Sequence, residues 1–352
     1  MRILITGGTG FIGCYFVNEL LSLGHSINVL DLHPFEEGAH GIDPKTIVDD
    51  DRVRFFQGDV RDAETVREAI HECQAVLHLA AAHHDFGISE KTFDEVNIGA
   101  AQILCDAMDA VGIKQICFFS TVAVYGETEP PVDEDAQLDA ISPYGKTKLG
   151  GEQIFQTWAE ADSSRRCLTI RPTVTFGVGN FANMFTLIKQ IESGMFLPVG
   201  DGKNIKSLSY VENIIDATVR QWLDQPVDEP YKVYNYVCKP DLTSREIADI
   251  VYKALGKKTP SFRVPYLLAR ALALPMDLVI GVTGKNLPIS GARIRKLAKA
   301  QTQYESDRIR DDGYQQRVTL EEGIQRMVQW YLDRGKEEAK QGVKRRLPPE
   351  RS

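Results

Sequence analysis

Residues 2–13, RILITGGTGFIG, decide the fold class of this chain. The apolar run before the glycines predicts a short buried strand, and the stretch from Phe11 to Leu23 predicts an amphipathic helix. Gly7, Gly10 and Gly13 have the GxxGxxG spacing. Their expected roles are a tight turn out of the strand, a close approach of backbone to a diphosphate, and close packing of the helix on the sheet. A strand, a glycine loop and a helix in this order are typical of a dinucleotide-binding unit.

Strand and helix patterns continue to alternate through the first ~170 residues. Further strands are predicted at 26–31, 53–57, 75–79, 115–120 and 168–171, with helices at 62–72 and 91–111 among those between them. This alternation predicts an α/β fold with a Rossmann-type, doubly wound parallel sheet. After Pro172 the pattern loosens: one strand is predicted at 233–237 and helices at 184–192, 212–223, 243–255 and 320–334.

We therefore expect a nucleotide-binding domain over residues 1–172, to which a strand and helix from about 207–240 contribute. Residues 173–335 are expected to form mainly a smaller α/β C-terminal lobe that binds the substrate, and 336–352 a basic, solvated tail. The apolar stretch 264–282 contains Pro265, Arg270, Pro275 and Asp277, so it is too interrupted for a membrane span. We expect a buried helix pair there. The alternative is a surface that lies on a membrane or covers a lipid-linked substrate.

The composition excludes some partners and indicates a compartment. A net charge of −8 argues against a nucleic-acid partner, because phosphate backbones require a basic surface. The six cysteines form no CxxC pair, which predicts neither a zinc site nor a redox dithiol: Cys14, Cys73, Cys105, Cys117, Cys167 and Cys238. Buried free thiols suit a reducing compartment. Since the first strand directly follows Met1, leaving no room for a secretory signal, we expect a cytoplasmic protein, at the inner face of the membrane if the alternative for 264–282 holds.

Carboxylates and small residues at the ends of the predicted strands favour NAD as the cofactor. Asp31 ends the second strand, where a carboxylate accepts the adenosine ribose hydroxyls and repels the additional phosphate of NADP. The alternative is that Asp31 only caps a turn. Asp59 follows the third strand and is a candidate acceptor for the adenine amino group. The run 79–81, LAA, follows the fourth strand and would leave room for the cofactor.

Three side chains predict the catalytic chemistry. Tyr144 and Lys148 are four residues apart in a predicted helix and therefore share one of its faces. A neighbouring ammonium favours the phenolate and would lower the pKa of the tyrosine toward the working range. Thr121, after the fifth strand, is placed to donate a hydrogen bond to the reacting oxygen.

The motifs TGGTGFIG, STVAVYG and YGKTK resemble the extended short-chain dehydrogenase/reductase superfamily, in its NAD-dependent epimerase/dehydratase branch, up to about Arg334. The resemblance implies that Thr121 is the active-site hydroxyl, that Tyr144 is the acid/base, and that Lys148 binds the nicotinamide ribose. It also implies a homodimer. It gives as cofactor contacts Gly7, Gly10, Phe11, Ile12, Asp31, Asp59, Val60, Leu79, Ala80, Ala81, His83, Asn97, Tyr144 and Lys148.

Strings in the later part of the chain, such as AAAHHD, RPTVTFG, KSLSYVENI and VPYLLA, resemble bacterial 4-epimerases of cell-surface polysaccharide assembly. Among these, the resemblance is greatest to enzymes acting on polyprenyl-diphosphate-linked N-acetylglucosamine. Two positions depart from the family pattern. Val174 stands where many members have a substrate-contacting asparagine. Lys206 stands where many have an arginine on the diphosphate, and it lacks the bidentate fork of arginine.

The residues after Thr121 bear on the reaction. Dehydratases of the family carry an Asp-Glu pair there, whereas this chain has Val122 and Ala123, which transfer no proton. The sequence therefore favours 4-epimerisation of a diphosphate-linked sugar through a 4-keto intermediate. Besides Thr121, the candidate substrate contacts are His84, Asn180, Asn183 and Lys206. His83 and His84 lack a third ligand of suitable spacing, so no metal is expected. An NAD-dependent dehydrogenase or reductase of a sugar or hydroxysteroid-like alcohol, and an NAD-sensing protein without turnover, remain as alternatives.

Overall fold

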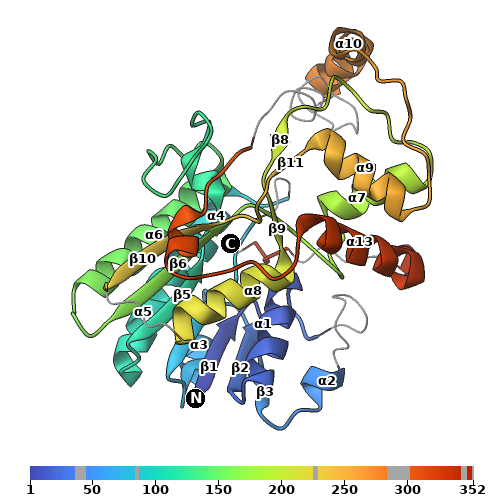
Figure 1. Cartoon of the computed structure of the whole chain (residues 1–352). Coiled ribbons are helices and arrows are strands. Elements are labelled where there is room, and N and C mark those ends of the chain that lie inside the picture. Colours follow the sequence, from blue (N-terminus) through green and yellow to red (C-terminus); the bar gives the residue numbers. More distant parts are fainter. Residues whose placement is uncertain (36–44, 84–86, 225–228, 284–301, 342–346, 351–352) are drawn as a thin grey trace.

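The computed structural model describes residues 1–35, 45–83, 87–224, 229–283, 302–341 and 347–350. Its centre is a parallel sheet (Figure 1) in the spatial order β10-β6-β5-β4-β1-β2-β3. The strands of this sheet are β1 Arg2–Thr6, β2 Ser26–Asp31, β3 Val53–Gln57, β4 Ala75–His78, β5 Gln115–Phe119, β6 Arg166–Pro172 and β10 Tyr231–Tyr236. Because β1 pairs with both β2 and β4, the strand order reverses beside β1, as expected for a doubly wound sheet.

The helices cover both faces of the sheet and build the second half of the chain (Figure 1). Those beside the sheet are α1 Phe11–Ser22, α2 Lys45–Val48, α3 Ala63–Ile70, α4 Glu90–Asp94, α5 Ala100–Val111, α6 Pro143–Glu160 and α8 Val211–Val219. The others are α7 Asn183–Glu192, α9 Ser244–Ala254, α10 Tyr266–Thr283, α12 Asp307–Asp311, α13 Leu320–Trp330 and α14 Lys336–Gln341. Short strands pair in the second half: β7 Val174–Phe176 with β9 Leu208–Tyr210, and β8 Ile205–Lys206 with β11 Leu242–Thr243.

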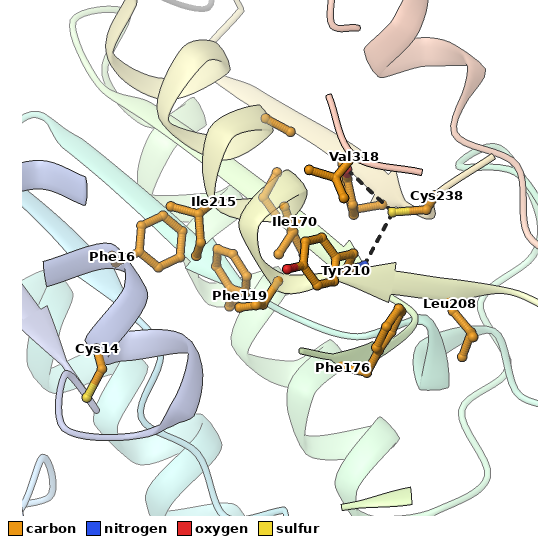
Figure 2. Close-up of a cluster of buried hydrophobic side chains, with 14 of the residues drawn as sticks. Cys14, Phe16, Phe119, Ile170, Phe176, Leu208, Tyr210, Ile215, Cys238 and Val318 are labelled. Atoms are coloured by element: carbon orange, nitrogen blue, oxygen red, sulfur yellow. Dashed lines mark hydrogen bonds between the residues drawn. The ribbon is translucent and has the colours of Figure 1, made fainter. Parts of the chain in front are cut away.

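Alternate residues of each strand enter different cores, as a sheet covered on both faces requires. On β5, Ile116 and Phe118 face the cluster formed with α3, α5 and α6. Cys117 and Phe119 face the other cluster, which includes α1 and α8. Figure 2 shows this second cluster, where Phe119 lies near side chains from several elements of the chain.

The second cluster extends from the first strand to Tyr331, so the two parts of the chain share one continuous core. The strand β10, from the second half, completes the sheet by pairing with β6, and α8 packs on α1. The expected contribution of residues near 207–240 to the sheet half is consistent with this arrangement. We still propose that the part before residue 173 binds the nucleotide and that the part after it mainly binds the substrate, although the two parts do not have separate cores.

Several local expectations can be compared with the structure. All six cysteines are buried free thiols, as their apolar surroundings indicated. The expected buried helix pair at 264–282 is wrong: the segment forms one helix, α10, from which Leu267 and Leu272 point into solvent with 78% and 65% of their surface exposed. No helix in the described ranges is both long and apolar enough to cross a bilayer. The last stretch also differs from a solvated tail, because it begins as α14 and Pro348 is buried.

Candidate active site

The glycine loop between β1 and α1 forms a cradle without side chains. Gly7 adopts a left-handed conformation with φ +73°, and a Cβ there would lie 2.7 Å from the amide nitrogen of Ala80. A Cβ on Gly13 would lie 2.4 Å from the carbonyl oxygen of Gly7. The loop, the start of α1 and the segment after β4 therefore meet backbone to backbone, which leaves amide groups and the positive end of α1 facing the carboxyl edge of the sheet.

Asp31, at the end of β2, fixes this loop. Its Oδ2 accepts a hydrogen bond from the amide of Thr9 at 3.2 Å, and its Oδ1 accepts one from the amide of His33 at 3.3 Å. The turn-capping role considered for Asp31 is therefore present. Each carboxylate oxygen has capacity for a second donor, so Asp31 can also accept ribose hydroxyls.

A cavity that is open to solvent lies over these elements. The predicted contacts that line it are Gly7, Gly10, Asp31, Asp59, Val60, Leu79, Ala80, Ala81 and His83. The sequence did not single out the remaining lining residues Leu30, Leu32, His33, Gly58, Val96 and Pro348. A glycine cradle, a carboxylate and apolar walls fit the diphosphate, ribose and adenine of NAD.

Asp59 is held rigidly by an arginine that the sequence analysis did not identify. Arg61 is buried, and its guanidinium binds both carboxylate oxygens of Asp59, with Nη2 at 2.7 Å from Oδ2. The same guanidinium donates to Glu95 at 3.1 Å. Most of the acceptor capacity of the Asp59 carboxylate is therefore used by Arg61. The proposed hydrogen bond from the adenine amino group would use the lone pairs of Asp59 that Arg61 leaves available.

Phe11, Ile12 and Asn97, which are also predicted cofactor contacts, are not among the residues that line the cavity. Phe11 and Ile12 begin α1 and pack against the core. Asn97 is buried, and its side-chain amide accepts a hydrogen bond from the backbone amide of Ala82 and donates one to the carbonyl oxygen of Ala82. It also donates to the hydroxyl of Thr147 at 2.9 Å. It joins the segment after β4 to α6, so a direct contact with the cofactor stays a prediction. His84 lies outside the described residues.

Thr121 and Tyr144 come together because α6 approaches the end of β5 closely. Ser142 caps α6 by accepting a hydrogen bond from the amide of Gly145 at 3.0 Å, and Pro143 occupies the first turn. A Cβ on Gly145 would lie only 2.6 Å from the carbonyl oxygen of Ala123. This approach brings Tyr144 close enough to Thr121 for the threonine side chain to affect the ionisation of the phenol.

The pKa values of Tyr144 and Lys148 differ from the expectation that an ammonium lowers the pKa of the tyrosine. Burial raises the pKa of the Tyr144 phenol to about 12, and the hydrogen bond with Thr121 opposes that rise. Lys148 is buried with its Nζ 4.2 Å above the ring centre of Phe118. Burial lowers the pKa of Lys148 to about 7, against the effect of the Glu152 charge. The expected lowering of the tyrosine pKa by an ammonium is absent here, because Lys148 itself is poorly solvated as a cation.

A buried polar network lies one turn further along α6. Arg171 binds Glu152 through two bonds, from Nε at 3.0 Å and from Nη2 at 2.6 Å, and both side chains are almost fully buried. Its Nη1 donates to the hydroxyl of Tyr125 at 2.7 Å, and that hydroxyl donates to Asn235 at 2.8 Å. The network connects α6, which carries Tyr144, to β6 and β10.

Of the predicted substrate contacts, Asn180, Asn183 and Lys206 lie in the second half of the chain, whereas Thr121 and His84 belong to the first half. Asn180 accepts from the amide of Ala182 at 2.8 Å and shapes the turn before α7, and the exposed Asn183 begins α7. Lys206 lies on β8 opposite Leu242. Their roles toward a substrate remain predictions.

The comparisons with known proteins agree with this architecture. A sequence model of the NAD dependent epimerase/dehydratase family matches residues 3–236. The chain is 33% identical over 330 residues to the N-acetyl-alpha-D-glucosaminyl-diphospho-ditrans,octacis-undecaprenol 4-epimerase of Escherichia coli O157:H7, covering 94% of this chain and 95% of that enzyme. It is 29% identical to UDP-glucose 4-epimerase of Bacillus subtilis strain 168, over 74% of this chain and 84% of that one.

Among solved structures, a UDP-glucuronic acid 4-epimerase from Bacillus cereus in complex with NAD superposes with a TM-score of 0.74 at 22% identity. The match covers 94% of this chain and 98% of that one, and it shows the same fold. With the family model spanning the whole nucleotide-binding half, this chain belongs to the NAD dependent epimerase/dehydratase family.

Proposed function

We propose that this protein is an NAD-dependent 4-epimerase of a diphosphate-linked sugar. The observation that carries the proposal is that α6 brings Tyr144 to Thr121, which follows β5, the strand next to the one that leads into the dinucleotide cavity. Val122 and Ala123 follow Thr121 and supply no further proton-transfer group. This set is sufficient for removal and return of one hydride and one proton.

In the proposed reaction, Tyr144 takes the proton of the sugar 4-hydroxyl and later returns it. The glycine loop and Asp31 would hold NAD, which when bound would supply reversible hydride transfer at C4 of the sugar. Thr121 holds the reacting oxygen by a hydrogen bond. Because burial favours the neutral phenol, Tyr144 requires positive charge nearby, which Lys148 supplies when it is protonated.

We also propose a lipid-linked substrate of the kind named for the Escherichia coli relative, a sugar on a polyprenyl diphosphate. Two features support it. The relative matches this chain over almost its full length. In addition, α10 exposes Leu267, Leu268, Leu272 and Leu274 at the end of the molecule remote from the parallel sheet (Figure 1). A helix that exposes several leucines is suited to the membrane interface, where a polyprenyl substrate resides.

The test begins with heat-denatured protein, which should release NAD. Native protein is then supplied separately with UDP-glucose, UDP-N-acetylglucosamine and polyprenyl-diphosphate-linked N-acetylglucosamine, while absorbance follows NADH and NMR follows the product. An epimerase yields the 4-epimer without net NADH. NADH in proportion to product would instead establish a dehydrogenase, and the absence of any turnover with all three sugars would favour an NAD sensor.

Two further proposals have their own measurements. Contact with the inner face of the membrane predicts that the protein sediments with vesicles made of bacterial lipids. The homodimer implied by the family resemblance predicts a mass near twice 39.3 kDa by light scattering. A monomer that remains in the supernatant would contradict both.

A further inference from the structure

The C-terminal residues Leu347–Glu350 lie against the dinucleotide cavity, more than 250 residues from the strands that build it. Pro348 is buried and is one of the residues lining the cavity, together with Asp59 and Val60. Leu347 packs over Gly87, where an added Cβ would lie 3.3 Å from its Cδ1. The end of the chain therefore supplies part of the wall of a site that is otherwise formed by β1–β4 and the segments that follow them.

Directed polar contacts hold this segment on both sides of Pro348. At the start of α4, the Glu350 carboxylate accepts a hydrogen bond from the amide of Ser89 at 3.0 Å. It also accepts hydrogen bonds from the hydroxyls of Ser89 and Thr92 at 2.7 Å each. These bonds lower the pKa of Glu350 to about 2, because they stabilise the charged carboxylate. On the other side, Arg61 donates from Nη2 to the carbonyl oxygen of Pro349 at 2.7 Å.

Arg61 ties the C-terminal segment to the adenine end of the site. The guanidinium that binds Pro349 also binds both oxygens of Asp59, the predicted partner of the adenine amino group. The sequence suits this position. Pro348 and Pro349 have no amide hydrogens, so they can border an apolar cavity without leaving a donor unpaired. Their fixed φ angles also reduce the conformational entropy lost when the segment docks.

We propose that Leu347–Glu350 is part of the NAD site and that it closes the adenine end, so that the dinucleotide is retained between turnovers. An enzyme whose dinucleotide takes a hydride from the sugar and returns it to the sugar in the same turnover gains from slow release of that dinucleotide. The inference itself concerns cofactor binding and does not depend on which sugar is the substrate.

The experiment compares full-length protein with a chain ending at Arg346 and with Glu350→Ala. Stopped-flow fluorescence measures NADH dissociation, and calorimetry measures the affinities for AMP and for nicotinamide mononucleotide. Loss of the apolar Pro348 contact together with the polar bonds should speed NADH release about tenfold. Glu350→Ala should speed NADH release about threefold, since the two hydrogen bonds of Glu350 with Ser89 are solvent-exposed. Both variants should lower the affinity for AMP and leave the affinity for nicotinamide mononucleotide unchanged.

Two controls separate this role from a general effect on folding. Glu337→Ala removes another carboxylate of the C-terminal region, exposed on α14, and should leave NADH release unchanged. Thr92→Val removes one donor to Glu350, so its effect and that of Glu350→Ala should not add. NADH release within twofold of wild type in the truncated chain would overturn the proposal. So would tighter NADH binding, or an equal loss of affinity for nicotinamide mononucleotide.

Discussion

The helices α6 and α10 have the same length, 18 residues, and opposite relations to solvent. The helix α6 buries charged side chains, Lys148 and Glu152, beside Thr147. The described part of α10 exposes leucines and buries little besides Ala269 and Ala273, which pack on Val199, Val264 and Tyr266. Exposed polar and buried apolar residues need no explanation, whereas buried charges and exposed leucines do. The buried Glu152 of α6 is explained within the chain by its pairing with Arg171. The exposed leucines of α10 form a surface that contact with a lipid layer would cover, as we propose.

The largest effect is expected at Tyr144, because the function of α6 rests on its phenol. Tyr144→Phe should lower kcat by about 10²–10⁴-fold, the usual contribution of a general acid or base, while NADH affinity stays near wild type. Product formation measured by NMR, with NADH titration alongside, checks both parts. Tyr252→Phe on α9, a buried tyrosine in the other half, is the control. Near-native turnover by Tyr144→Phe would remove Tyr144 from the mechanism.

The buried pair under Tyr144 should dominate the stability of α6. Glu152→Ala leaves the Arg171 guanidinium buried without its carboxylate, which costs about 3–5 kcal/mol of unfolding free energy. Replacing both residues, as Glu152→Leu with Arg171→Met, should recover most of this loss because no unpaired charge remains. Glu160→Ala, at the exposed end of α6, is the matched control. Urea unfolding monitored by circular dichroism gives the comparison, and equal stability of the single and double variants would contradict it.

Lys148 gives α6 a dependence on pH. Its pKa is lowered by burial to about 7 in the folded protein, below the value of about 10.4 for an unfolded chain. Between these values the unfolded chain binds more protons, so the free energy of unfolding should rise with pH by up to about 1.4 kcal/mol per unit. Lys148→Met should lose this rise. The free energies of unfolding of wild type and Lys148→Met are measured on nucleotide-free protein from pH 7 to 10. The difference between them isolates the contribution of Lys148 from that of other titrating groups.

Local patterns and chain topology predicted most of the sheet half. The glycines, Asp31 and the residues after β4 meet at one edge because parallel strands end there, and spacing alone places Tyr144 and Lys148 on one face. The contact of Pro348 with the cavity was not predictable, since nothing local indicates where a distant end of the chain docks. The pairing of Glu152 with Arg171 also depends on tertiary packing. The exposure of α10 was considered only as the alternative to a buried helix pair, because an apolar run predicts burial but does not identify the surface that covers it.

The smallest effect is expected at α10, where a single leucine contributes to a surface and not to the core. Leu267→Ser removes one exposed apolar side chain, so it should weaken partitioning onto lipid vesicles by about tenfold without lowering the melting temperature. Leu332→Ser, another exposed leucine outside α10, should leave partitioning unchanged. If Leu267→Ser instead lowered the melting temperature, the leucines would stabilise the fold. The contrast between α6 and α10 would then be one of packing, and the lipid-linked substrate would lose the support that α10 gives it.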